Sequence, residues 1–224
     1  MRVSRVNRAT ASQSLSVSFT VGLYGTAFGA ASIAAGFSVL QTCLLSLLAF
    51  SGASQFAVVG VMGAGGTAIA GIATASLLGV RNMLYALRMA PLLRVSGFKK
   101  VIAAQVTIDE STGVALSQEK LGTEAMKQGF WLTGFGVYIF WNIFTLLGAL
   151  GAKAMGDPSA WGLDAAVPAA FLGLVWPRLT NKLERALAIC ALVLAVLLSP
   201  VLSAGLPIIS TVVLAVIFGW KVRR

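Results

Sequence analysis

The sequence predicts an all-α integral membrane protein, a helical bundle with six to eight transmembrane spans. Of its 224 residues, 58% are hydrophobic and only 11% are charged, whereas about a quarter of the residues of a soluble domain are charged. Residues 9–80, 128–152 and 186–220 contain no Asp, Glu, Lys or Arg. A span needs about 20 mostly apolar residues, so we treat residues 1–224 as a single transmembrane domain.

The first span is expected over residues 17–36. Small residues recur there at alternating spacings of three and four: Gly22, Gly25, Gly29, Ser32 and Gly36. This spacing places them on one helix face, where they allow another helix to approach closely. Because the apolar run continues well beyond the length of a signal peptide, we interpret it as a retained span.

Residues 37–63 are apolar except at their centre, where five small or polar residues follow one another: Ser51, Gly52, Ala53, Ser54 and Gln55. Glycine and serine lower helix propensity. One interpretation is a tightly packed helix with a kink. The other is a broken or re-entrant helix whose freed backbone groups line a cavity.

A further helix is expected over residues 67–87, with a second small-residue stripe at Gly71, Ala75 and Gly79 and with Pro91 at its end. Residues 92–127 are more polar and predict a loop with an amphipathic or partly inserted helix. The remaining spans are expected over residues 130–150, 165–176, 186–199 and 206–220.

The net charge of +10 is concentrated in short clusters beside the apolar runs, where it acts as a topology signal rather than as a nucleic-acid contact. If residues 37–63 dip in and return, six crossings place every basic cluster inside. If they cross, and residues 101–118 also form a span, there are eight crossings. Both termini are cytoplasmic in either case.

Enzyme chemistry is not expected. The chain has no His, and its two cysteines, Cys43 and Cys190, lie inside apolar runs. A Ser-His or Cys-His nucleophile therefore cannot form, and no metal site or cofactor is predicted.

Arg81 is the main candidate binding residue, because an Arg inside the bilayer needs a partner or an aqueous cavity. Asn82 and Tyr85 lie beside it, and Arg88 follows two turns later. The alternative is that the two arginines extend to the headgroups. Asn142, within a span, either contacts a ligand or forms an interhelical hydrogen bond.

Asp109 and Glu110 form the chain's adjacent acidic pair. In an exposed loop they would simply be solvated. If residues 101–118 insert into the membrane, two carboxylates at that depth predict a proton-coupling or ammonium-binding site.

Three motifs, in order, resemble the AzlC family, the large subunit of branched-chain amino acid exporters. Residues 50–57 (FSGASQFA) are similar to its GASQF signature, residues 81–85 (RNMLY) followed by Pro91 to its next motif, and Asp109-Glu110 to its acidic pair. The family often has Asn and His where this chain has Gly79 and Asn82.

The resemblance implies a secondary transporter that exports valine, leucine or isoleucine across the bacterial cytoplasmic (inner) membrane, with a small AzlD-like membrane subunit as partner. We expect Asp109 or Glu110 to couple protons, and we expect these residues to bind substrate: Ser51, Gly52, Ser54, Gln55, Arg81, Asn82, Tyr85 and Asn142. The alternatives are a channel or exporter for another small solute and a non-transporting assembly subunit.

Overall fold

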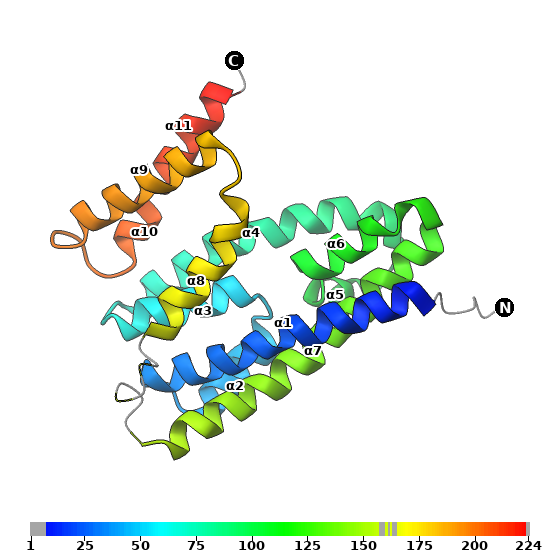
Figure 1. Cartoon of the computed structure of the whole chain (residues 1–224), viewed down its shortest axis with the longest axis horizontal. Helices are drawn as coiled ribbons and strands as arrows, with labels where there is room; N and C mark the ends of the chain where they lie inside the picture. The colour runs from blue at the N-terminus through cyan, green and yellow to red at the C-terminus, as the bar shows by residue number, and fades with distance from the viewer. Residues whose placement is uncertain (1–7, 157–159, 161, 163–164, 223–224) are drawn as a thin grey trace.

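The computed structural model describes residues 8–222, except 157–159, 161 and 163–164. Throughout this part of the chain the regular structure is helical, as predicted (Figure 1). The elements are α1 (Arg8–Ala34), α2 (Val39–Leu48), α3 (Gly52–Gly63), α4 (Ala68–Leu93), α5 (Phe98–Gln105), α6 (Asp109–Ser117), η1 (Glu119–Leu121), α7 (Thr123–Ala154), α8 (Ala166–Val175), η4 (Trp176–Arg178), α9 (Lys182–Leu198), α10 (Leu206–Ser210) and α11 (Val212–Val222).

The two long helices α1 and α7 pack side by side in a parallel arrangement. Gly22 faces Phe140, and further along α1 Gly29 faces Thr145 and Ala149. A Cβ at either glycine would overlap the backbone or side chain of α7. The first small-residue stripe is therefore a close-packing face, as its spacing predicts.

The second small-residue stripe, on α4, faces α3. Gly71 lies against Val58, Gly79 lies against Ser54, and the Ser54 hydroxyl donates to the Ala75 carbonyl at 2.9 Å. As residue numbers rise on one helix they fall on the other, so α3 and α4 are antiparallel.

Helices α2 and α3 together form a hairpin that begins and ends at one end of the molecule. Ala35, which follows α1 and precedes α2, lies against Gly63 at the end of α3. The helix pattern is interrupted from Ala49 to Ser51. A break near Ser51 was one of the two interpretations of residues 37–63, and the structure has that break.

Helices α5 and α6 form a second hairpin, at the opposite end. The Gln118 amide, just after α6, donates to the Gln13 amide oxygen at 2.7 Å, close to the start of α1. The two hairpins meet at their tips, where the Gln105 amide of α5 donates to the Leu47 carbonyl of α2 at 2.9 Å. Residues 98–117 are thus neither the loop with one helix nor the continuous span that the sequence suggested.

Helices α9 and α11 extend away from this bundle (Figure 1), whereas α10 contacts α4. Helix α8 packs against α1 and α3, and α9 pairs with α10 and α11. Asn181 caps α9, and hydrogen bonds from the Asn181 and Thr180 backbone hold the pKa of Glu184 below its usual value.

Three helices, α1, α4 and α7, are long and apolar enough to cross a membrane. The six to eight spans predicted from the sequence stay a prediction, since the other apolar helices are shorter. One boundary was wrong: α4 continues past Pro91 to Leu93 and ends where Arg94 adopts a left-handed conformation (φ 49°). Pro91 has no backbone N–H and so removes one intrahelical hydrogen bond, but the helix continues for two more residues.

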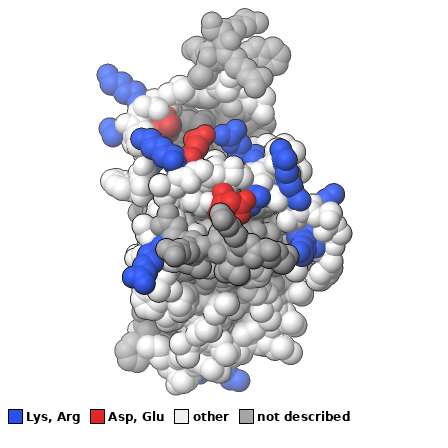
Figure 2. Space-filling view, turned by 90° about the vertical axis from the view of Figure 1, so that its right-hand side faces the viewer, with Lys and Arg blue, Asp and Glu red and all other residues white. Residues whose placement is uncertain are grey.

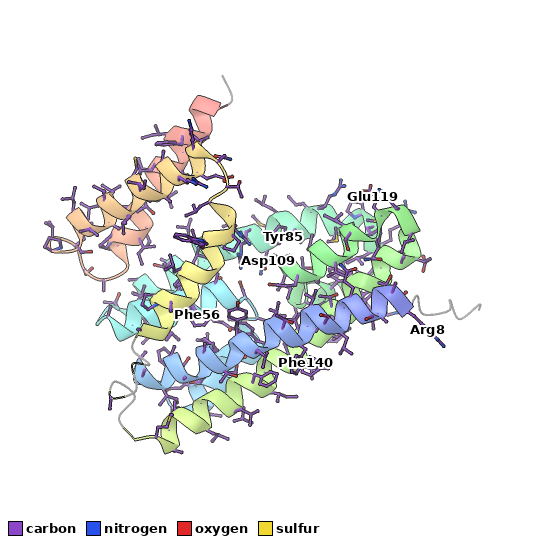
Figure 3. All side chains as sticks on the ribbon, in the orientation of Figure 1. Arg8, Phe56, Tyr85, Asp109, Glu119 and Phe140 are labelled. Carbon is purple, nitrogen blue, oxygen red and sulfur yellow. The ribbon has the colours of Figure 1, made fainter. Side chains whose placement is uncertain are left out.

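One end of the molecule carries many basic side chains. Figure 2 looks onto the end at the right of Figure 1, where many blue Lys and Arg side chains and few red ones are visible. The described part of the chain also begins at this end, with Arg8 (Figure 3).

Candidate functional site

A cavity of about 120 Å³ lies between the two helix breaks. In Figure 3, Asp109, one of its lining residues, lies near the middle of the molecule, whereas Arg8 and Glu119 lie toward the right-hand end. Both breaks, α1, α4 and α7 contribute to its wall. The lining residues are Val21, Tyr24, Phe50, Ser51, Gly52, Ala53, Phe56, Arg81, Ile108, Asp109, Glu110, Val137 and Trp141.

The first break is held open by Gln55, whose side chain is fully buried. Its amide nitrogen lies 3.0 Å from the Ala49 carbonyl and 3.3 Å from the Ser46 carbonyl, both at the end of α2. Its amide oxygen accepts a hydrogen bond from the Trp141 indole N–H at 2.9 Å. Gln55 therefore satisfies carbonyls that the helix break leaves without intrahelical donors.

Ser51, at the start of α3, presents unused hydrogen-bonding capacity to the cavity. Its residue is 9% exposed, and its hydroxyl has no hydrogen-bond partner among the described residues. It does not cap α3, so the first N–H groups of that helix also lack a side-chain cap. The N-terminus of a helix favours negative charge, which makes this side of the cavity suitable for an anion.

The second break, at Val106, Thr107 and Ile108, is stabilised by a local hydroxyl group. Ser111 Oγ donates to the Val106 carbonyl at 2.7 Å and accepts from the Ile108 N–H at 3.1 Å. Asp109 and Glu110 occupy the first turn of α6, where carboxylates interact favourably with the helix dipole.

Two guanidinium groups contact the same carboxylate oxygen. Asp109 Oδ2 lies 3.4 Å from Arg81 Nη1 and 3.1 Å from Arg178 Nη2. The side chains of Asp109 and Arg81 are 24% and 26% exposed, whereas that of Arg178 is 58% exposed. Arg81 Nε is buried and has no partner among the described residues, so Arg81 retains a donor for another anion.

The structure brings five of the ten predicted site residues together around this cavity: Ser51, Gly52, Arg81, Asp109 and Glu110. The other five do not line it. The Ser54 hydroxyl donates a hydrogen bond to the Ala75 carbonyl of α4, and the Gln55 amide donates to the Ala49 carbonyl at the end of α2. Asn142 donates to the Tyr138 carbonyl one turn earlier on α7 at 2.8 Å. Asn82 and Tyr85 follow Arg81 on α4, and Asn82 Oδ1 is buried without a partner among the described residues.

Three functional candidates were missed by the sequence interpretation. Trp141 both lines the cavity and anchors Gln55, Gln105 joins the two hairpin tips, and Arg178 reaches Asp109 from 69 residues away. Only Arg178 had a signal, as a cation in a basic cluster, but that cluster also fits a purely topological role.

A protein-family model described as AzlC protein matches residues 16–155, more than half of the chain. The chain belongs to the AzlC family. The match covers α2 to α7 entirely and most of α1, so every cavity-lining residue falls within it, whereas α8 to α11 lie outside. AzlC proteins are associated in general with branched-chain amino acid export. Searches of curated proteins and of solved structures find no match.

Proposed function

We propose that this AzlC-family chain is a secondary transporter that exports branched-chain (neutral) amino acids, and that its substrate binds in the cavity between the two helix breaks. The observation that carries the proposal is the placement of hydrogen-bond donors from Ser51 and Arg81 opposite carboxylates from Asp109 and Glu110 within one cavity. An amino acid zwitterion removed from water needs both kinds of partner.

The substrate carboxylate is placed at the first break. Ser51 Oγ and Arg81 Nε are buried polar atoms without hydrogen-bond partners among the described residues, and α3 begins beside Ser51, at Gly52 of the cavity wall. These groups together provide a hydroxyl, a cation and a helix N-terminus, each of which binds carboxylate.

The substrate ammonium is placed at the second break, beside Asp109 and Glu110. A carboxylate pair can neutralise an ammonium group, or it can hold a proton when the ammonium is absent, because two adjacent negative charges repel each other. This alternative occupation offers a physical basis for coupling export to proton movement.

The apolar wall of the cavity receives the hydrocarbon side chain of the substrate. Phe56 and Trp141, whose rings meet edge to face with centroids 6.5 Å apart, form that wall with Val21 and Ile108. Of the predicted site residues outside the cavity, Ser54 and Gln55 hold α3 in place. Asn82, Tyr85 and Asn142 support the helices around the cavity.

In the membrane, we place α1, α4 and α7 as spans and the two hairpins as re-entrant elements that enter from opposite sides. Re-entrant backbone is tolerated at this depth where it lines a protein cavity. The shorter C-terminal helices complete six or more crossings. The basic end of the molecule (Figure 2) then faces the cytoplasm, with both termini, in the bacterial inner membrane.

Proteins of this family generally work with a partner subunit, and we assign that role to a small AzlD-like membrane protein. The exposed apolar faces of the described helices, for example at Ile69 (81% exposed) and Leu87 (68% exposed), must be covered by lipid or by another protein. Export is therefore expected to need coexpression of the partner.

The proposal is tested by comparing Arg81→Ala with Arg88→Ala in cells fed branched-chain dipeptides, with the partner coexpressed. Arg81 contacts Asp109 in the cavity, whereas Arg88 is exposed two turns away. Hydrogen bonds to charged groups contribute about 1.5–3 kcal/mol, so Arg81→Ala should slow export roughly tenfold or more at equal membrane abundance. A crippling Arg88→Ala with a silent Arg81→Ala would refute the site.

A further inference from the structure

Asp109 carries one negative charge but is contacted by two cations from different parts of the chain. Arg81 comes from α4, within the family match, while Arg178 comes from η4, beyond residue 155 where the match ends. The Arg178 contact is the shorter of the two, 3.1 Å against 3.4 Å. Arg178 therefore reaches the centre of the candidate site from outside the part of the chain that the family model matches.

The segment that carries Arg178 is held over the site from both sides. Before it, Phe171 of α8 packs edge to face on Phe56 of the cavity wall, with centroids 6.2 Å apart. After it, Arg185 Nε donates to the Leu179 carbonyl at 3.0 Å. Pro177 lies in the first turn of η4 and limits its backbone freedom.

The two cations differ in how easily they can leave Asp109. The Arg81 side chain is 26% exposed, so its departure would leave a largely desolvated guanidinium without a partner. The Arg178 side chain is 58% exposed, so the protein encloses it much less than Arg81, and an ion pair with a more exposed partner contributes less. Arg178 is thus the replaceable cation of the pair.

We infer that Arg178 is a specificity-determining residue that occupies the ammonium subsite of the empty transporter and is displaced by the ammonium group of the substrate. The inference rests on the proposed function. A ligand with an ammonium group competes with Arg178 for Asp109. A ligand with a carboxylate but no ammonium does not, and it benefits from Arg178 because the guanidinium keeps Asp109 neutralised.

This competition predicts opposite effects on two ligands of the same shape. Arg178→Gln removes the competitor, so leucine should bind about twofold to fivefold more tightly, the range expected for a partly exposed ion pair. For 2-hydroxy-4-methylpentanoate, which has a hydroxyl in place of the ammonium, the same change should leave binding unchanged or weaken it, because Asp109 now repels the ligand carboxylate.

The experiment measures equilibrium binding of labelled leucine to membranes that contain the chain with its partner subunit, and competition by the hydroxy acid. Arg178→Lys retains the cation and should resemble wild type for both ligands. Lys182→Gln is the matched control, because the same stretch carries this cation and the ion pairs among the described residues do not include it.

The outcomes separate the two claims. Absence of leucine binding to the wild-type complex would reject the proposed function itself. Leucine binding by wild type, with Arg178→Gln shifting both ligands equally or neither, would reject the displaceable cation while leaving the site in place. Tighter leucine binding together with unchanged or weaker binding of the hydroxy acid, in Arg178→Gln but not in Lys182→Gln, supports it. If Arg178→Gln is not recovered in membranes, Arg178→Ala, which also removes the cation, is measured in its place: tighter leucine binding without tighter hydroxy-acid binding supports the inference, and equal shifts or no shift overturn it.

Discussion

The two helix breaks that form the cavity are stabilised by different interactions. The break between α2 and α3 is neutral, and it is stabilised by a buried glutamine that bonds to Ala49 and Trp141. The break between α5 and α6 is charged, and its Asp109 forms ion pairs with Arg81 of α4 and Arg178 of η4. The first depends on short, buried hydrogen bonds that hold the fold. The second depends on partly exposed ion pairs, in which a ligand can replace one partner. We therefore assign the first break mainly to folding and the second mainly to the response to substrate.

Gln55→Leu tests the structural role of the first break and should have the largest effect. The change removes the side-chain donor to the Ser46 and Ala49 carbonyls and leaves the Trp141 N–H without its acceptor, and each unsatisfied buried group costs about 1–3 kcal/mol. We expect a clear loss of thermal stability in detergent. Trp141→Phe, which removes one of these bonds but leaves the other, should lose less. Full stability in Gln55→Leu would show that the first break does not depend on the hydrogen bonds of Gln55, and would contradict the structural role assigned to it.

Ser51→Ala separates binding from folding within the first break. Because its hydroxyl has no hydrogen-bond partner in the part of the chain that the structure describes, the change should leave thermal stability almost unaltered. If that hydroxyl binds the substrate carboxylate, leucine affinity should fall about tenfold or more, since hydrogen bonds to charged groups contribute about 1.5–3 kcal/mol. Binding and melting are measured on the same preparation. Unchanged affinity would move the carboxylate subsite elsewhere.

Ser111→Ala tests how strongly the second break is held by its own residues, and its effect should be the smallest. The loss of the hydrogen bonds to Val106 and Ile108 should cost about 1 kcal/mol of stability, as for a helix cap. Thr107→Val, which removes a bond to the Ala103 carbonyl one turn earlier, is a neighbouring comparison. A loss as large as that of Gln55→Leu would show that both breaks are structural.

Parts of this fold could be predicted from spacing alone. The stripe at Gly22, Gly25 and Gly29 predicts a close helix contact, and the structure shows it, because small side chains at spacings of three and four necessarily share a helix face. What spacing could not predict was the partner, since any apolar helix can in principle approach such a face. That the partner is α7, in parallel, follows from the complementary Gly136 and Gly148 and from the return of the chain through both hairpins.

The first break was signalled locally and the second was not. Residues 51–55 are small or polar in an apolar context, which indicates interrupted structure. Val106, Thr107 and Ile108 carry only the weak signal of β-branched residues, and Asp109-Glu110 resembles a solvated surface turn. The second break is instead fixed by tertiary bonds, including the bond from Gln105 to the carbonyl of Leu47.

Composition and the period of the helix predict that this protein lies in a membrane, that it is helical and which helix faces pack closely. The packing of the helices is needed to bring Ser51, Arg81 and Asp109 to one cavity and Arg178 to the same carboxylate oxygen as Arg81. Hydrogen bonds and ion pairs act over a few ångströms between atoms that the chain separates by tens of residues. Their partners are therefore set by how the helices pack.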